Sequence, residues 1–375
     1  MQLCYAGALT SMAIPALTIR SLYTTAVTVP MKRPLGTSAQ TVRTAPLLLV
    51  DLETEQGVTG RTYLYCYLPV AAGMLARALE ECLVVIKGEQ VEPRRIGDKL
   101  WRHFCLAGTT GVIGMALSAI DVVCWDALAS AVGTSLCRFL GGQPSAIPAY
   151  NSNGLGLMPA QGAADDAEAL LEGGFGGVKM RLGHADFADD LTAVRAVRKR
   201  LPRGIELMAD YNQALSVEEA LERGRALDGE GLAWIEEPIR HDDYAGCARL
   251  AEEVTTPIQI GENFAGPQAM AAALAANAAD YMMLDAFRIG GVTGWRESAA
   301  LAFRPGMRLS SHLVPELSVH LLAITPTRHW VEYVDWANPI LAEPLAVTQG
   351  AMTPPERPGT GLRWDDAAVA RYRVA

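Results

Sequence analysis

The pattern of apolar and polar positions changes about a third of the way along the chain. Residues 17–66 are rich in β-branched and aromatic residues separated by Gly and Pro, which predicts strands. From about 70 to 140, apolar residues recur every three or four positions, as in "GMALSAIDVVCWDALASAVG", which predicts helices with a stop at Gly133. The first 140 residues therefore predict an α+β unit in which strands precede helices.

After Pro148, short apolar runs alternate with helical patterns. Six times a run such as "GGVKMRL", "IELMADYN" or "LAWIEEP" is followed by an amphipathic segment, and Ser216 with Glu219 forms a capping box at one of these helices. Repeated βα units with apolar strands favour a (β/α) barrel over an open sheet. No G-x-G-x-x-G motif follows any of the strands, so nothing supports a nucleotide-binding fold.

The predicted fold class is therefore α/β, a TIM-type barrel with an added N-terminal α+β domain. We expect the α+β capping domain at residues 1–140 and the barrel at residues 141–355. We expect residues 356–375 to return and complete the cap.

Ionisable residues stand at the ends of the predicted strands. Asp210, Glu236 and Glu262 are spaced by 26 residues, about the length of one βα unit, so they occupy equivalent positions on consecutive strands. In a barrel, this places them together on the carboxyl-terminal rim, where active sites lie. Although a single acid there is more often a helix cap or an ion-pair partner, three converging carboxylates require a cation. Ligands that are all oxygen predict Mg²⁺.

Further ionisable residues border the same rim. Lys179 and Arg181 are two apart on one strand and so share a face. His312 ends a later strand, one strand after Asp285, and a carboxylate beside a histidine fixes its tautomer and raises its basicity. Glu332 ends a further strand. These positions predict a group of acids and bases around the metal.

Composition excludes several classes of protein. The 375 residues carry a formal charge of −9 and no cationic stripe, which argues against nucleic acid as a partner. We expect no membrane partner, because no uninterrupted apolar run reaches the ~18 residues of a membrane span. Seven cysteines without a C-x-x-C pair predict a reducing, cytoplasmic location. The mildly apolar start, "MQLCYAGALTSMAIPA", lacks a basic leader, so a signal peptide is disfavoured and Met12 is an alternative start.

Several motifs in order carry a family resemblance: "VKMRLG", "MADYNQ", "WIEEP", "IGEN", "DAFRIGGVTGW", "SSHL" and "HWVE", together with "RTAPLLLVDL", "FCLAG" and "AIDVVCWDAL". They extend over nearly the whole chain, which resembles the enolase superfamily in its mandelate racemase subgroup. The resemblance implies a capping α+β domain over a modified (β/α)7β barrel. It also implies a homo-oligomer that acts on a small-molecule carboxylate.

The resemblance implies roles for individual positions. Asp210, Glu236 and Glu262 match the Mg²⁺ ligands. His312 and Asp285 match the dyad that acts as the base on the R face of a 2-hydroxy acid.

Four more positions match groups that contact the substrate or flank the metal. Glu332 matches the acid that hydrogen-bonds a carboxylate oxygen as the enolate develops. Lys179 matches a lysine that contacts the substrate carboxylate, and Ser152 matches a further contact. Asn212 matches a polar group beside the metal.

The resemblance also implies which positions line the substrate side chain. They are Leu35, Val42, Tyr65, Tyr67, Leu313 and Val334. This set is apolar and aromatic, whereas an acid sugar needs polar partners for its hydroxyl groups. Lys32, Arg33 and Arg43 lie near the first of these segments and could supply some of those partners.

The chain departs from the racemase pattern at Arg181, where that subgroup has a second lysine that is the base for the S face. Arginine side chains stay protonated in proteins, so Arg181 is poorly suited to this task. The first reading is a Mg²⁺-dependent, mandelate racemase-like isomerase that forms a metal-stabilised enolate from an aromatic or apolar 2-hydroxycarboxylate. One alternative is an acid-sugar dehydratase, a lyase in which His312 is both base and acid. A reading of another class is a degenerate binding homologue.

Overall fold

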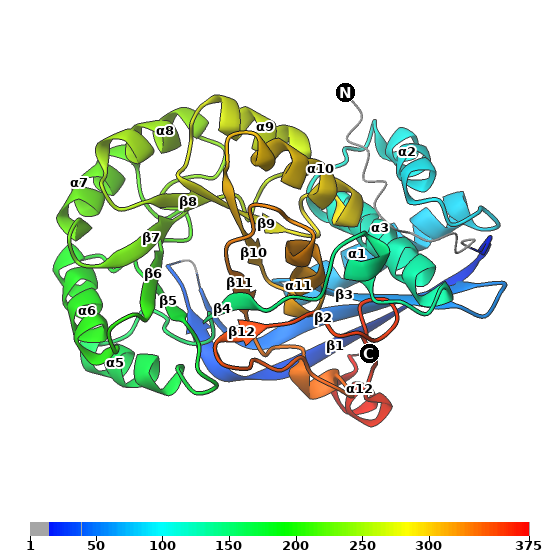
Figure 1. The fold of residues 1–375 in the computed structure, drawn as a ribbon, viewed down its shortest axis with the longest axis horizontal. Coiled ribbons are helices and arrows are strands. Elements are labelled where there is room, and N and C mark those ends of the chain that lie inside the picture. The colour runs from blue at the N-terminus through cyan, green and yellow to red at the C-terminus, as the bar shows by residue number, and fades with distance from the viewer. Residues whose placement is uncertain (1–14, 39, 375) are drawn as a thin grey trace.

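The computed structural model of the chain describes residues 15–38 and 40–374, so most of the N-terminal stretch considered above lies outside the described residues. Its first part is an antiparallel sheet of order β1–β2–β3, formed by Ile19–Gly36, Thr41–Thr54 and Thr59–Tyr65. Four helices follow: α1 (Pro69–Ile86), α2 (Pro93–Phe104), α3 (Gly111–Ala131) and α4 (Leu136–Phe139). Figure 1 shows this cap beside the open end of a ring of strands and helices.

The second part is a nearly closed parallel barrel. Its strands are β4 (Ile147–Asn151), β5 (Gly177–Arg181), β6 (Glu206–Asp210), β7 (Leu232–Glu236), β8 (Ile258–Ile260), β9 (Tyr281–Asp285), β10 (Arg308–His312) and β11 (Val331–Tyr333). They pair in chain order from β4 to β10, and β11 pairs with β4. The gap between β10 and β11 is bridged by hydrogen bonds such as Ser311 N to Trp330 O at 3.0 Å. The predicted barrel with an N-terminal α+β domain is confirmed.

Helices cover the outside of the barrel: α5 (Ala160–Ala169), α6 (Phe187–Arg200), α7 (Val217–Leu227), α8 (Tyr244–Glu253), α9 (Pro267–Ala275), α10 (Gly291–Phe303) and α11 (Pro315–Ala323). Ser216 caps α7 with the predicted box, in which Glu219 bonds back to it. The sequence pattern missed the first unit, β4 and α5. Strand β4 has five residues, and α5 begins after a loop instead of a periodic apolar run.

Helix α3 corrects one expectation. Its 21 residues are long and apolar enough to cross a membrane, with a mean hydropathy of 1.8, although the sequence analysis expected no such segment. Two thirds of that window is buried inside the protein, so the burial of a core helix accounts for its composition. Its polar residues join the domains. Asp121 accepts from the N–H of Thr293 in α10 at 3.0 Å, and Asp126 accepts from the N–H groups of Arg61 and Thr360.

The chain end packs against the cap. After a short 3₁₀ helix (η1, Asn338–Ile340), strand β12 (Ala351–Met352) pairs with β4, and α12 (Asp366–Tyr372) follows. Trp364 Nε1 donates to the Asp51 carboxylate in β2 at 3.1 Å, and Val374 N donates to Ala26 O in β1 at 3.0 Å. The C-terminal segment therefore lies along the first sheet, on the side that Figure 1 colours red beside blue.

The tip of the β1–β2 hairpin reaches the barrel rim. Leu35 and Val42 are paired there, and Gly36 O accepts from Leu157 N at 3.1 Å in the loop after β4. A Cβ atom on Gly156 would stand 2.5 Å from the Gly36 backbone nitrogen, so this close approach requires glycine. Ser38 donates to Tyr211 O, one residue after β6. The hairpin thus lies over the carboxyl ends of the first strands.

Candidate active site

Three carboxylates meet on the rim of the barrel. Ligand oxygens of Asp210, Glu236 and Glu262 all lie within 4.8 Å of one another. Asp210 and Glu236 are register partners at the ends of β6 and β7, and Glu262 stands two residues beyond β8. The barrel therefore converts the regular spacing in the sequence into one cluster of oxygens.

The surroundings of this triad fit a divalent cation. Six carboxyl groups gather in a basin at this rim, namely Asp210, Glu236, Glu237, Glu262, Asp285 and Glu332, against the buried cations Lys179 and Arg181, with Arg288 at its edge. Burial raises the pKa of Glu236 to about 7, although Lys179 opposes the shift. Asn212 donates to Asp210 Oδ2 at 3.0 Å, and its own Oδ1 is buried without a hydrogen-bond partner among the described residues. An acid cluster with a spare acceptor oxygen is a suitable donor set for Mg²⁺.

Glu236 is held from behind by neutral donors. Trp234 Nε1 and Gln259 Nε2 each donate to its Oε2 at 3.1 Å. These bonds leave Oε1 to face the basin, where Lys179 Nζ lies 2.5 Å away. Polar partners behind a metal ligand set its orientation, so Trp234 and Gln259 serve the metal site without touching the metal.

Lys179 lies at the centre of the basin. Its fully buried ammonium contacts Glu332 Oε1 at 2.8 Å and Asp210 Oδ2 at 3.5 Å, in addition to Glu236. Burial lowers the pKa of Lys179, but Glu236 and Glu332 outweigh burial and leave the pKa well above its usual value. Lys179 is thus a fixed positive charge that can stabilise a developing anion.

Arg181 stands beside it and points to the first strand of the barrel. Its Nη2 donates to Ser152 Oγ at 3.0 Å, and Nη1 donates to Ser152 O at 2.9 Å. Its Nε is 4.0 Å from Asp210 Oδ2 and is buried without a hydrogen-bond acceptor within residues 15–38 and 40–374. Arg181 is therefore anchored as a cation, and Ser152 is its anchor.

His312 faces the triad from the opposite side of the ring. Its Nδ1 lies 2.8 Å from Asp285 Oδ2, its register partner in β9, and Nε2 lies 3.2 Å from Glu262 Oε2. Burial lowers the pKa of His312, but the carboxylates of Glu262, Glu332 and Asp285 outweigh burial and raise it to about 9. Because Asp285 accepts the Nδ1 proton, the lone pair of the neutral ring lies on Nε2, toward the basin.

Glu332 completes the basin between these two sides. Its Oε2 accepts from the backbone N–H of Leu313 at 2.8 Å. Leu313 has a φ of +51°, and this left-handed turn immediately after His312 directs the N–H at the carboxylate. Burial raises the pKa of Glu332, but Lys179 and His312 outweigh burial and hold it well below its usual value. Glu332 is ionised beside the two residues that would handle the substrate.

The predicted substrate wall comes from both domains. Tyr65 and Tyr67 stack edge to face, with ring centroids 4.8 Å apart. Burial raises the pKa of Tyr65 to about 12, and the charge of Arg181 opposes this shift. Burial also raises the pKa of Tyr67, and the carboxylates of Asp285 and Glu262 add to that shift. Both rings therefore lie close to the charged groups of the basin.

The other wall positions lie at the rim as well. Leu313 and Val334 are buried after β10 and β11, whereas Leu35 and Val42 are paired at the hairpin tip. Lys32 and Arg33 form ion pairs with barrel residues, Asp335 at 3.1 Å and Asp166 at 2.8 Å, and so attach the hairpin to the barrel.

Sequence reasoning missed four residues of the site: Glu237, Gln259, Asn263 and Arg288. Three of them stand inside motifs already recognised, "WIEEP", "IGEN" and "DAFRIGG", and Gln259 lies within the strand "PIQIGEN". Glu237 and Asn263 directly follow the ligands Glu236 and Glu262, but a polar residue next to an acid is too common to assign a role without coordinates. Trp336 was also missed, and it stacks on Tyr65 at 4.8 Å.

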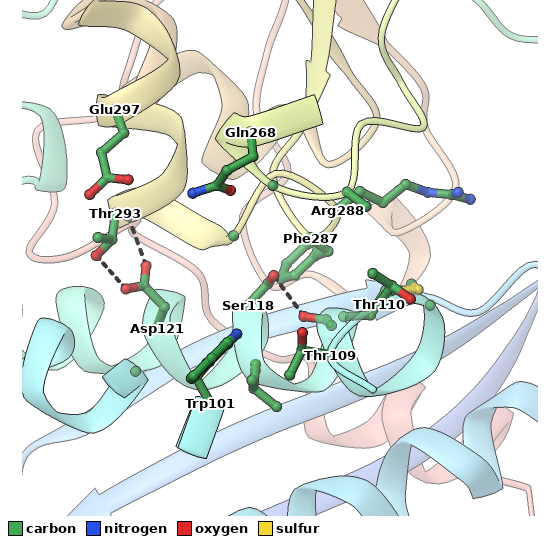
Figure 2. Close-up of a pocket in the computed structure, with 18 of the residues that line it drawn as sticks. Trp101, Thr109, Thr110, Ser118, Asp121, Gln268, Phe287, Arg288, Thr293 and Glu297 are labelled. Carbon is green, nitrogen blue, oxygen red and sulfur yellow. Dashed lines mark hydrogen bonds between the residues drawn. The ribbon is translucent and has the colours of Figure 1, made fainter. Parts of the chain in front are cut away.

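A separate pocket of about 420 Å³ lies between the cap and the barrel. Figure 2 shows Trp101, Thr109 and Ser118 on the cap side, with Gln268 and Thr293 on the barrel side. Asn263 and Arg288 line this pocket and also belong to the surroundings of the metal ligands, so the two sites share part of a wall.

Comparison with known proteins gives the family. Residues 162–368 match the enolase C-terminal domain-like family, and residues 19–141 match the N-terminal domain of the mandelate racemase / muconate lactonizing enzyme family.

Individual relatives are similar over most of their length. The chain is 34% identical over 333 residues to 3,6-anhydro-alpha-L-galactonate cycloisomerase of Streptomyces coelicolor, covering 88% of this chain and 91% of that protein. It is 30% identical over 323 residues to L-talarate/galactarate dehydratase of Salmonella typhimurium, covering 86% and 81%. An enolase from Bradyrhizobium, crystallised with magnesium and mandelic acid, has a TM-score of 0.92 and 38% identity, covering 97% of this chain and 100% of that one.

The two family domains match in the order in which the cap and the barrel follow one another. The acidic triad could hold a metal ion, and a related protein was crystallised with magnesium. Both observations identify the cofactor as Mg²⁺. The chain belongs to the enolase superfamily, in its mandelate racemase and muconate lactonizing enzyme group.

Proposed function

We propose that this chain is a lyase that removes the α-proton of a 2-hydroxycarboxylate with His312 and then eliminates a β-hydroxyl group from the same side. The main observation behind this proposal is that the two sides of the basin differ. One side holds the His312–Asp285 dyad, while the other holds a guanidinium bonded twice to Ser152. A base is therefore available on one face of the substrate.

The charges around the dyad suit enolate formation. Mg²⁺ held by Asp210, Glu236 and Glu262 would supply positive charge beside the substrate carboxylate. Lys179 adds a fixed ammonium, and fixed charges that stabilise the transition state are usually the largest contribution to catalysis. Glu332 lies 2.8 Å from Lys179 and, as an ionised acceptor, holds the Lys179 ammonium in place beside the substrate carboxylate.

His312 can carry out both proton transfers of this reaction. Nε2 takes the α-proton, and the electrons of the C–H bond form the enolate. These electrons then expel the β-hydroxyl, which leaves as water with the proton returned from His312. The resulting enol tautomerises to a 2-oxo acid. This sequence of steps is consistent with the name of the Salmonella relative, a dehydratase.

Racemisation of an aromatic 2-hydroxy acid is the second candidate. It is favoured by the apolar character of Leu313, Val334 and the paired rings of Tyr65 and Tyr67, and by the relative crystallised with mandelic acid. It requires proton delivery from the face of Arg181, and so it is the slower outcome in our proposal.

Deuterium exchange tests these functions. The protein with MgCl₂ in D₂O is incubated with aromatic and sugar-derived 2-hydroxy acids, followed by NMR and by an assay for 2-oxo acids. We expect a 2-oxo acid from at least one β-hydroxylated substrate. Exchange with inversion and no 2-oxo acid would favour the racemase. A protein that binds an acid without any exchange would be a binding homologue and would refute catalysis.

The cellular form of the protein is also a proposal. We infer a cytoplasmic homo-oligomer, on the resemblance and the cysteine pattern. Light scattering at micromolar concentration tests the assembly, and a monomer would refute it.

A further inference from the structure

Arg288 is held on the barrel rim by the turn between β9 and α10. The backbone N–H groups of Arg288 and Ile289 donate to Asp285 O at 3.1 and 2.9 Å. Figure 2 shows the Arg288 side chain running along the edge of the cap–barrel pocket, with its guanidinium directed away from the pocket interior. The guanidinium contacts two other elements, one on each side of the domain boundary.

The first contact leads to the metal ligands. Arg288 Nη1 donates to Asn263 Oδ1. Because arginine has only donors, the Asn263 oxygen must face it, and the amide nitrogen must face the other way. That nitrogen donates to Glu237 Oε2 at 2.7 Å and to Glu262 Oε1 at 3.3 Å. Arg288 thereby fixes the amide that orients the ligand Glu262.

The second contact leads to the cap. The Arg288 guanidinium carbon lies 4.9 Å from the centre of the Tyr67 ring, a cation–π geometry. Tyr67 has a φ of +60°, a conformation that is strained for a bulky residue, so the segment between β3 and α1 needs compensating contacts. Tyr65 supplies one of them, and Arg288 supplies the other.

We propose that Arg288 is a positioning residue that makes closure of the cap at Tyr67 and the geometry of the metal ligand Glu262 depend on one another. A change that loosens Tyr67 frees Arg288, and a freed Arg288 no longer fixes the Asn263 amide. By thermodynamic reciprocity, Mg²⁺ binding then favours the closed cap as much as the closed cap favours Mg²⁺. The inference rests on the proposed function only for the claim that the closed cap covers a substrate.

Titration calorimetry of the full chain, stripped of metal and titrated with MgCl₂, tests this coupling without any substrate. Arg288→Met should weaken Mg²⁺ binding about tenfold or more, the usual cost of an outer-shell partner. Tyr67→Leu touches no metal ligand, yet it should weaken binding about fivefold, at the low end of allosteric coupling. Tyr67→Phe keeps the ring and should bind like wild type, and Arg288→Lys should bind more tightly than Arg288→Met.

Arg296→Met is the matched control. Arg296, in α10, also joins barrel to cap through a cation–π contact, 5.4 Å from the Trp125 ring in α3, and so matches the kind of contact that Arg288 makes with Tyr67. Its Mg²⁺ affinity should equal that of wild type. Wild-type affinity in Tyr67→Leu, or equal weakening in Arg296→Met, would overturn the proposal.

The calorimetry measures metal affinity, so it can support the role of Arg288 even if the protein shows no deuterium exchange. The proposed function would then be refuted and the role of Arg288 retained. If Arg288→Met does not fold, as judged by circular dichroism, then Tyr67→Leu against Tyr67→Phe decides the question.

Discussion

Arg181 and Ser152 are bonded to each other at the bottom of the active-site basin. Nη2 of Arg181 donates to Ser152 Oγ at 3.0 Å, and Nη1 donates to the Ser152 backbone oxygen at 2.9 Å. Both residues matched substrate-handling positions in the sequence, yet the structure uses one to hold the other. The two bonds fix the direction of the guanidinium, which points toward the end of β4.

Arg181→Lys should raise racemisation relative to wild type. A lysine near Lys179 can lose its proton at working pH, because a like charge disfavours the charged form, whereas a guanidinium stays protonated. Polarimetry of single enantiomers of mandelate measures this. The idea fails if wild-type protein racemises both enantiomers rapidly and at equal rates.

His312→Asn should abolish deuterium exchange from R substrates, because it removes the Nε2 lone pair that we propose takes the α-proton. Asp285→Asn keeps the imidazole but replaces the carboxylate with a neutral amide, which no longer fixes the Nδ1–H tautomer, so exchange should slow by about 100-fold or more, in the range of general-base effects. NMR of the α-proton follows both variants. Unchanged exchange in His312→Asn would assign the base to another residue.

Asp210→Asn should weaken Mg²⁺ binding by at least about 100-fold, more than the loss of an outer-shell partner. Glu206→Gln is the matched control, since Glu206 begins the same strand β6 and is exposed. For wild type, Mg²⁺ at 100 times its dissociation constant should add about 2.7 kcal/mol to the free energy of unfolding. Thermal unfolding with and without MgCl₂ gives the comparison. An equal Mg²⁺ effect in Asp210→Asn would remove Asp210 from the site.

His320 should make the fold sensitive to acid. Its Nδ1 accepts from Cys137 N at 3.2 Å and its Nε2 faces Thr360 O at 3.2 Å, an arrangement that only the neutral ring satisfies. Burial lowers its pKa from 6.5 to about 4. Between these values the unfolded chain binds the extra proton, so stability falls as pH falls through this window.

The size of this effect can be separated from other titrations. Between pH 7.5 and 5.0, His320 should account for a loss of about 2 kcal/mol in the free energy of unfolding. Urea unfolding of wild type and His320→Gln at both pH values gives the difference, since every other group titrates in both proteins. The same pH dependence in the two proteins would contradict the assignment.

Several residues of the site have a strained backbone that the sequence did not predict. Tyr67, Asn212, Glu237 and Leu313 all adopt left-handed φ values, and all lie at or beside the basin. Local sequence preference disfavours this conformation for Tyr67, Glu237 and Leu313, so no pattern indicated it there, whereas asparagine adopts it more readily. Tertiary contacts are needed to hold it, and the turn at Leu313 directs the N–H that donates to Glu332.

The sequence by itself determined the barrel, the cap and the acidic triad. Hydrophobic periodicity reflects which face of each element is buried, and the 26-residue spacing from Asp210 to Glu262 reflects a repeated unit. Only the tertiary structure decided that Ser152 anchors Arg181, and that Arg288 joins Tyr67 to Asn263. These contacts link residues from different elements through side-chain directions. A one-dimensional pattern does not carry such directions, because they depend on how the two domains pack.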